Sequence, residues 1–226
     1  MRLTTGQAAG QLGMTGAPLR KLIATGLVPD VLDRPKGQVF PLAALDALKS
    51  VPMADLSTLP GPTLAVLRTG PAAAAPDDDP APEREWIGFG AGLTADQLLA
   101  ASDRWWRCDP ERVAAGRYLA VTVGEFVVAV LTGLEQAVHN GAPATMRRWH
   151  FTRASLLGWV TDLTDSTART ISTRAAAEDQ AIARQLLGCR LPSESGGPIA
   201  YVPAGPSMGV SAEGVTGWTG RPIPGP

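Results

Sequence analysis

Residues that build metal centres and disulfide scaffolds are scarce in this sequence of 226 residues, which has two cysteines and two histidines. Cys108 and Cys189 are too few for a disulfide scaffold, and the cytoplasmic compartment expected below disfavours a bridge between them. With His139 and His150 they make four potential zinc ligands, but no pair has the close spacing of a structural zinc site. We therefore expect two free thiols, no metal site and no cofactor.

Long apolar runs are missing as well. No segment of about 18 consecutive apolar residues is present, and the N-terminus lacks the hydrophobic region of a signal peptide. The hydrophobic content of 45% is nevertheless enough for ordinary globular cores. We expect a cytoplasmic protein with no membrane partner.

The motifs of common enzyme classes are also absent. The sequence has no glycine-rich phosphate loop, no nucleophile elbow and no histidine placed beside a cysteine or serine. Glu125, Glu135 and His150 could be combined into an acid and base set, but any chain of this length allows such a combination. The sequence therefore favours a binding protein over an enzyme.

Charge is unevenly distributed along the chain. The formal net charge is −1, yet residues 1–50 hold six basic and three acidic residues, including all three lysines, Lys21, Lys36 and Lys49. Residues 87–203 hold eleven basic and eleven acidic residues. Nonspecific DNA affinity comes from phosphates neutralised by basic side chains, so the charge favours the first part as a DNA contact. It implies no large nonspecific footprint for the second part.

The residue order between 4 and 48 predicts a small helical unit. Thr4 and Gln7 have the spacing of a capping box, in which each side chain satisfies a free backbone N–H of the other residue. The first helix should run to about Leu12 with one buried stripe. Gly13 then supplies the residue without a Cβ that a tight reversal needs.

A second helix is expected over roughly residues 17–25, with Thr15 as its N-cap and Pro18 in the first turn, where a missing N–H does no harm. Its buried face consists of three residues: Leu19, Leu22 and Ile23. Another face consists of four residues at helical spacing: Ala17, Arg20, Lys21 and Ala24. This second face is small and positively charged, so it can lie in a major groove about 12 Å wide.

A wing and a third helix should follow. Residues 27–40 predict two short extended pieces around residues 33–37, DRPKG, a turn-forming cluster that carries two cations. The third helix is expected from Pro41 to about Lys49, with proline at its start, where no N–H is needed. It should bury three leucines: Leu42, Leu45 and Leu48.

The segments TTGQAAGQLGMT and LRKLIATGLVP, followed by a glycine-bearing wing and a leucine-rich helix, resemble the winged helix-turn-helix of the bacterial excisionase and MerR-like regulators. The resemblance covers about the first fifth of the chain. It implies that the second helix reads the major groove and that the wing contacts the flanking minor groove or backbone. The positions implied to touch DNA are Thr15, Arg20, Lys21, Arg34, Lys36 and Gln38.

Departures from that pattern make direct base readout sparse. Gly16 and Pro18 stand where polar residues that touch DNA are expected, and Asp30 and Asp33 place negative charge beside the wing. The alternative is a helical protein-interaction module in which Arg20 and Lys21 are exposed to solvent and contact no DNA.

Beyond residue 50 the sequence predicts a linker (51–62), a second domain (63–203) and a disordered tail (204–226). In the second domain we expect strands over residues 63–68, 86–89, 117–123, 125–132, 146–151 and 199–202, and helices over 93–104, 155–162 and 174–187. Residues 70–82, which include three consecutive aspartates, should form a solvated loop in a hairpin.

The segment from WWRCDPER to VVAVL, followed by RRWHFT and GGPIAYVP, is similar to a small β-rich module found near bacterial nucleases and to PUA-like folds. The resemblance implies a barrel-like antiparallel sheet and a pocket for a modified or unusual base. The implied pocket residues are Trp105, Trp106, Arg107 and Trp149. The alternative places the tryptophans in the core and the arginine in a salt bridge at the rim.

These observations together predict an α+β protein that binds double-stranded DNA as a transcriptional regulator or excisionase-like factor, with a second domain for sensing, recruitment or oligomerisation. The first alternative is a reader of modified DNA in a restriction or defence system, and the second is a structural adaptor. A single helix-turn-helix contacts one half-site, so we expect a homodimer or cooperative assembly on DNA.

Overall fold

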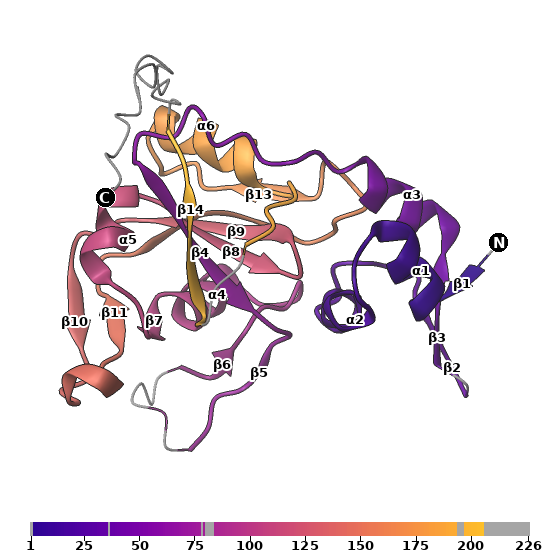
Figure 1. Ribbon diagram of the computed structural model, residues 1–226, viewed down its shortest axis with the longest axis horizontal. Coiled ribbons are helices and arrows are strands. Elements are labelled where there is room, and N and C mark those ends of the chain that lie inside the picture. Colours follow the sequence, from indigo (N-terminus) through magenta and orange to yellow (C-terminus); the bar gives the residue numbers. More distant parts are fainter. Residues whose placement is uncertain (1, 36, 78, 80–83, 194–196, 206–226) are drawn as a thin grey trace, which may run out of the picture.

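The computed structural model describes residues 2–35, 37–77, 79, 84–193 and 197–205. The chain has the α+β composition that the sequence predicts, with a small N-terminal unit at one end and a larger second domain (Figure 1). Lys36 lies outside the described residues, and so do residues 206–226 of the predicted disordered tail (204–226). The prediction was wrong for the two described tail residues, because Ala204 and Gly205 donate their N–H groups to the carbonyl oxygens of Pro62 and Leu56.

The N-terminal unit comprises, in chain order, β1 (Arg2–Thr4), α1 (Thr5–Leu12), α2 (Gly16–Ala24), β2 (Leu32–Arg34), β3 (Gly37–Pro41) and α3 (Leu42–Ser50). The predicted capping box is confirmed, since Thr4 accepts from the Gln7 N–H at 3.3 Å and Gln7 accepts from the Thr4 N–H at 3.0 Å. Gly13 ends α1 with a positive φ of 68°, as its predicted role in the reversal requires. Strand β1, which was not predicted, pairs with β3 and completes a sheet of order β1-β3-β2.

A shared apolar core holds the three helices on this sheet. Its largest fully buried side chains include Leu19, Leu22, Phe40, Leu45 and Leu48. The four leucines recur at helical spacing in α2 and α3, which is why the spacing identified them. Ile23 and Leu42 were also predicted to be buried, but both are only half-buried. The β2–β3 hairpin projects from the unit away from the second domain (Figure 1).

The second domain contains β4 (Thr63–Thr69), β5 (Ala73–Ala74), β6 (Trp86–Ile87), α4 (Ala95–Ser102), β7 (Arg104–Trp106), α5 (Pro110–Gly116), β8 (Leu119–Val123), β9 (Phe126–Thr132), β10 (Ala137–His139), the short 3-10 helix η1 (Ala144–Met146), β11 (Trp149–Phe151), β12 (Ser155–Val160), β13 (Arg169–Ile171), α6 (Ala177–Leu186) and β14 (Ile199–Pro203). Its main sheet has six strands in the order β13-β12-β9-β8-β4-β14. A three-stranded sheet of order β10-β11-β7, here called the subsheet, and the β5–β6 pair stand beside it.

The main sheet differs from the barrel-like antiparallel sheet that the sequence suggested. Strands β4 and β8 run parallel, and the other neighbours are antiparallel. Within the described residues the sheet is open, with β13 and β14 at its edges. The parallel pair is possible because a long crossover containing α4 and α5 joins β4 to β8.

The predicted helix over residues 155–162 was wrong, because this segment forms strand β12. The apolar run SLLGWV fits a buried strand as well as a helix, and its neighbours β9 and β13 decide between them. Gly158 fits this setting because a Cβ there would lie 2.5 Å from the carbonyl oxygen of Thr170. Helix α5 and strand β13 were also not predicted.

The acidic loop also differs in part from its prediction. The side chain of Asp79 is 5% exposed and forms an ion pair with the buried guanidinium of Arg84. The guanidinium also donates to the carbonyl oxygen of Arg104 at 2.5 Å. One of the three consecutive aspartates is therefore held inside the domain rather than solvated.

The loop after α2 fastens the N-terminal unit to the second domain. The N–H of Ala91 donates to the carbonyl oxygen of Thr25 at 2.8 Å, and the N–H of Leu163 donates to that of Leu27 at 2.9 Å. The side chain of Leu27 is fully buried. The two parts are therefore joined by backbone hydrogen bonds and by apolar packing at one end of α2.

The segment 51–62 follows the surface of the second domain. The structure describes all of it, and it contains no helix or strand. Ala54 donates its N–H to the carbonyl oxygen of Arg190 at 2.8 Å, and Arg190 donates its own to that of Pro52 at 2.8 Å. Leu59 is buried. The connection is therefore held along its length.

Candidate nucleic-acid interface

Helix α2 presents one uninterrupted exposed row. The four residues of this row are exposed: Ala17, Arg20, Lys21 and Ala24. The opposite side of the helix is fully buried through Leu19 and Leu22, which are 0% exposed. Within the part of the chain that the structure describes, the charged ends of Arg20 and Lys21 have no hydrogen bond or ion pair. The row is therefore not required for the fold and is open to a partner.

Gly16 and Pro18, the two residues of α2 that depart from the pattern of the winged helix-turn-helix resemblance, each have a structural reason. Gly16 lies against Arg20, since a Cβ at Gly16 would be 3.1 Å from a guanidinium nitrogen. Pro18 packs toward the second domain, where a Cβ at Gly124 would lie 3.6 Å from side-chain carbons of both Pro18 and Leu22. One position makes room for a cation and the other contacts the β8–β9 turn.

A first cleft, called here the wing cleft, lies on one side of the row and has a volume of about 590 Å³. Its lining consists of Thr4, Thr5, Gly6, Arg20, Gly37 and Gln38. The amide of Gln38 donates to Asp33 at 3.1 Å, which occupies one of the two carboxylates near the wing. Arg34 lies in β2, all three residues of which are exposed. The lining of the wing cleft thus includes hydroxyl and amide side chains and one cation from α2.

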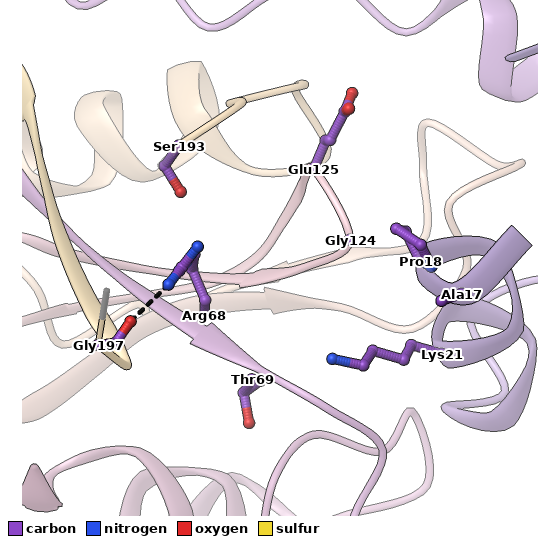
Figure 2. A pocket seen from close by; sticks show the side chains of 9 residues that line it. All are labelled: Ala17, Pro18, Lys21, Arg68, Thr69, Gly124, Glu125, Ser193 and Gly197. Atoms are coloured by element: carbon purple, nitrogen blue, oxygen red, sulfur yellow. Dashed lines mark hydrogen bonds between the residues drawn. The ribbon is translucent and has the colours of Figure 1, made fainter. Parts of the chain in front are cut away.

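A second cleft, the interdomain cleft, lies on the other side of the row and has a volume of about 470 Å³. Figure 2 shows Lys21 extending from α2 toward β4, where Arg68 and Thr69 line the facing wall. The carboxylate of Glu125 is directed away from Lys21 in the same view. It forms an ion pair with Arg190 at 2.5 Å, so its charge is compensated.

The predicted DNA-contacting residues thus fall into separate places. Arg20 and Gln38 meet in the wing cleft, whereas Lys21 enters the interdomain cleft. Thr15 is exposed at the N-terminus of α2, where its side chain makes no capping hydrogen bond. Arg34 stands on the wing. The five described positions therefore lie in separate places rather than in a single patch, and Lys36 lies outside the described residues.

Sequence reasoning missed several lining residues, among them Thr5, Gly6 and Arg68. Thr5 and Gly6 begin α1 and border the wing cleft. They could have been found from the rule that the first turn of a helix exposes backbone N–H groups. Arg68 could not, because nothing in its own strand indicates that the strand end faces α2.

The second predicted site is built on the subsheet, where its four residues do not all share one face. Trp106 and Trp149 are register partners on β7 and β11. Trp106 packs on the core and donates its indole N–H to the carbonyl oxygen of Ser102 at 2.8 Å. Trp105 instead meets His150 edge to face, with ring centroids 5.4 Å apart.

The other two predicted pocket residues, Arg107 and Trp149, make contacts of their own. Arg107 donates to the carbonyl oxygen of Thr145, and it lines a cleft of about 350 Å³ together with Met146, Arg148, Gly197 and Pro198. Trp149 is flanked by the His139 ring at 5.3 Å and by the Arg147 guanidinium at 6.0 Å from the ring centroid. A cation and a second aromatic ring therefore lie beside Trp149, and the cleft that Arg107 lines has none of the three tryptophans among its lining residues.

A buried charge cluster lies beneath the subsheet. Asp103 is 4% exposed and accepts from Arg104 at 2.5 Å and 2.9 Å, with His150 at 3.5 Å. Burial raises the pKa of Asp103, and the hydrogen bond and charge of Arg104 oppose that rise. The N–H of Phe151 donates to the Asp103 carbonyl oxygen, so the cluster links α4, β7 and β11. Its contacts are those of a structural centre.

The potential zinc ligands lie apart from any donor cluster. In the described ranges no group of three or more histidine, cysteine, aspartate or glutamate side chains is arranged to hold a metal ion. Both cysteines are free thiols. Burial raises the pKa of the Cys108 thiol to about 12, with the nearby Asp109 charge adding to the effect. No helix among the described residues combines the length and apolar character needed to cross a membrane.

Comparisons of the chain with protein-family models, with curated proteins and with solved structures found no match.

Proposed function

We propose that the protein binds double-stranded DNA through its N-terminal unit and acts as a transcriptional regulator or excisionase-like factor. The second domain would then serve sensing, recruitment or oligomerisation. The observation that carries the proposal is the exposed row on α2, where Ala17 and Ala24 flank Arg20 and Lys21 and none of the four is part of the buried core.

The shape and charge of this row suit a major groove. Ala17 and Ala24 let the helix approach closely, and the arginine and lysine beside them can reach phosphates or guanine edges. The β2–β3 hairpin stands next to the wing cleft and can contact the flanking backbone. A unit of this size covers one half-site, so a homodimer or cooperative assembly on DNA belongs to the proposal.

The proposal is tested by the binding of the full chain to a random-sequence duplex, measured by fluorescence anisotropy over a series of salt concentrations. Each phosphate that the protein neutralises should add about 0.9 to the negative slope of log affinity against log salt. We expect binding at low salt with a slope of several units. The absence of binding at low salt would refute the proposal.

A second candidate function, the reading of modified bases, is supported by one observation on the subsheet. The Trp149 ring contacts the His139 ring and the Arg147 guanidinium, and its chain neighbour Arg148 lines a cleft together with Arg107. An aromatic ring with cations nearby can stack on an extruded base and hold its phosphates. Parallel titrations with plain duplexes and duplexes carrying modified cytosines test this candidate, which predicts tighter binding to the modified duplex.

A further inference from the structure

Helix α2 divides the surface between the two clefts. Arg20 and Lys21 are adjacent in sequence, so their side chains diverge by about 100° around the helix axis. Arg20 lines the wing cleft and Lys21 lines the interdomain cleft. The small residues Ala17 and Ala24 lie between these two directions and form the crest.

A DNA duplex that binds to this crest has two sugar-phosphate backbones, and each must lie beside the helix. A helix that enters the major groove, about 12 Å wide and about 8.5 Å deep, has a phosphate strand on each side of it. One strand would face the wing cleft, and the other would face the interdomain cleft. The facing wall of the interdomain cleft belongs to the second domain.

That wall has the chemistry of a phosphate contact. Arg68, near the end of β4, is half-buried and donates to the carbonyl oxygen of Gly197 at 2.5 Å, which fixes its guanidinium in the cleft (Figure 2). The hydroxyl-bearing Thr69 follows it in the lining. Glu125 is paired with Arg190, so its carboxylate does not offset the charge of Lys21.

The second domain is held in position to use this wall. The backbone hydrogen bonds from Ala91 to Thr25 and from Leu163 to Leu27 fix the end of α2, and Gly124 packs near its beginning. A contact from Arg68 would therefore need no rearrangement of the two parts. Preorganisation of this kind increases the affinity that one added contact provides.

We propose that the interdomain cleft receives one phosphodiester backbone of the bound duplex and that Arg68 contacts it together with Lys21. The inference rests on the proposed function and adds a DNA contact from outside the N-terminal unit. The contact is to phosphate, so it acts equally on all sequences.

Salt titrations of the full-length protein with a random-sequence duplex test this inference. Arg68→Ala should weaken binding by about tenfold at low salt and lower the salt slope by about one. Arg68→Lys keeps the charge and should keep the slope. A melting curve of each variant shows whether the domain remains folded.

Arg153→Ala is the matched control. Arg153 is exposed, and its carbonyl oxygen approaches Gly133, just beyond the end of β9 that lies opposite the Gly124 turn. The seven residues of β9 separate the two ends by roughly 20 Å. This variant should bind with the affinity and slope of the wild type.

Thr69→Glu keeps the test valid if Arg68→Ala does not fold. It leaves the Arg68 to Gly197 hydrogen bond in place and adds a negative charge to the cleft, so it should also weaken binding about tenfold. If the wild type binds DNA and Arg20→Ala weakens it, but the folded cleft variants bind as the wild type does, this inference is overturned and the proposed function stands. If the wild type does not bind at low salt, the proposed function itself fails.

Discussion

Helix α2 and the subsheet differ in what their side chains already do. On α2, Arg20 and Lys21 are exposed and, within the described chain, their charged ends have no protein partner. On the subsheet, Trp106 donates a hydrogen bond to the carbonyl oxygen of Ser102, and Arg107 donates one to that of Thr145. A ligand can therefore use the α2 row without breaking internal contacts, whereas the subsheet must give some up. The comparison favours α2 as the primary binding surface.

Replacement of Trp106 tests the subsheet side of the comparison and should have the largest effect. Its indole packs on the core, so Trp106→Ala should cost about 3 kcal/mol of unfolding free energy, near the low end for buried aromatic residues because the ring is half-buried. This corresponds to a fall of roughly 10 °C in melting temperature for a chain of this size. Chemical denaturation and thermal melting measure it.

Trp149→Ala is the control for that prediction. Trp149 is the cross-strand partner of Trp106 but is not among the residues packed on the main core. Its replacement should lower the melting temperature clearly less. The comparison would break if Trp106→Ala melted like the wild type and lost DNA affinity, because Trp106 would then line a binding surface.

Removal of both cations from α2 tests the other side of the comparison. Arg20→Ala combined with Lys21→Ala should weaken DNA binding well over tenfold, at roughly 1 to 3 kcal/mol for each lost contact. The melting temperature should hardly change, because both side chains are exposed. Lys49→Ala is a matched control from α3, where the lysine donates to Gln11 at 3.1 Å. Unchanged affinity in the double variant would exclude α2 as the DNA-binding helix.

The sequence predicted the N-terminal unit well because its signals are local. Capping by Thr4 and Gln7, the reversal at Gly13 and the helical spacing of apolar residues depend on neighbours within one or two turns. Strand β1 escaped prediction because its three residues carry no period, and its partner β3 lies far along the chain. Local order therefore identified the helices, and distant pairing decided the strand.

Contacts between residues far apart in the sequence also explain which predictions failed in the second domain and in the candidate site. The run at residues 155–160 became a strand because β9 and β13 flank it. The interdomain cleft depends on Arg68 meeting α2 across two parts of the chain, and no periodicity in either segment indicates that contact. The residues of α2 were thus predictable, but the wall they face was not.

The reactivity of the Cys108 thiol tests whether the region beside the subsheet is closed to solvent. Burial raises the pKa of the Cys108 thiol to about 12, so the thiol stays protonated from neutral pH up to pH values close to that pKa. Because the thiolate is the reactive form, Cys108 should react with a disulfide reagent at pH 8 more than about tenfold slower than an exposed thiol. Cys189, whose pKa is also raised mainly by burial, should behave alike.

Unfolding the protein in urea supplies the reference for this measurement. Both thiols should then react at the ordinary rate. The Cys108→Ser variant has Cys189 as its only thiol. A rapid phase in the folded form of this variant would therefore be assigned to Cys189. A rapid phase in the folded Cys189→Ser variant would show that the region around Cys108 opens to solvent. The internal contacts of the subsheet would then be weaker than the structure indicates.

Gly16→Ala should have the smallest effect and separates stability from binding on α2. Gly16 has an ordinary helical environment without a positive φ, so alanine should stabilise the protein by about 0.4 to 1 kcal/mol through the unfolded state. The new Cβ would lie 3.1 Å from the Arg20 guanidinium and displace it. We expect a slightly higher melting temperature together with a DNA affinity a few-fold lower at about 100 mM salt. A variant that gains stability and keeps full affinity would mean that the position of Arg20 beside Gly16 is not the one used on DNA, since the displaced side chain would bind equally well.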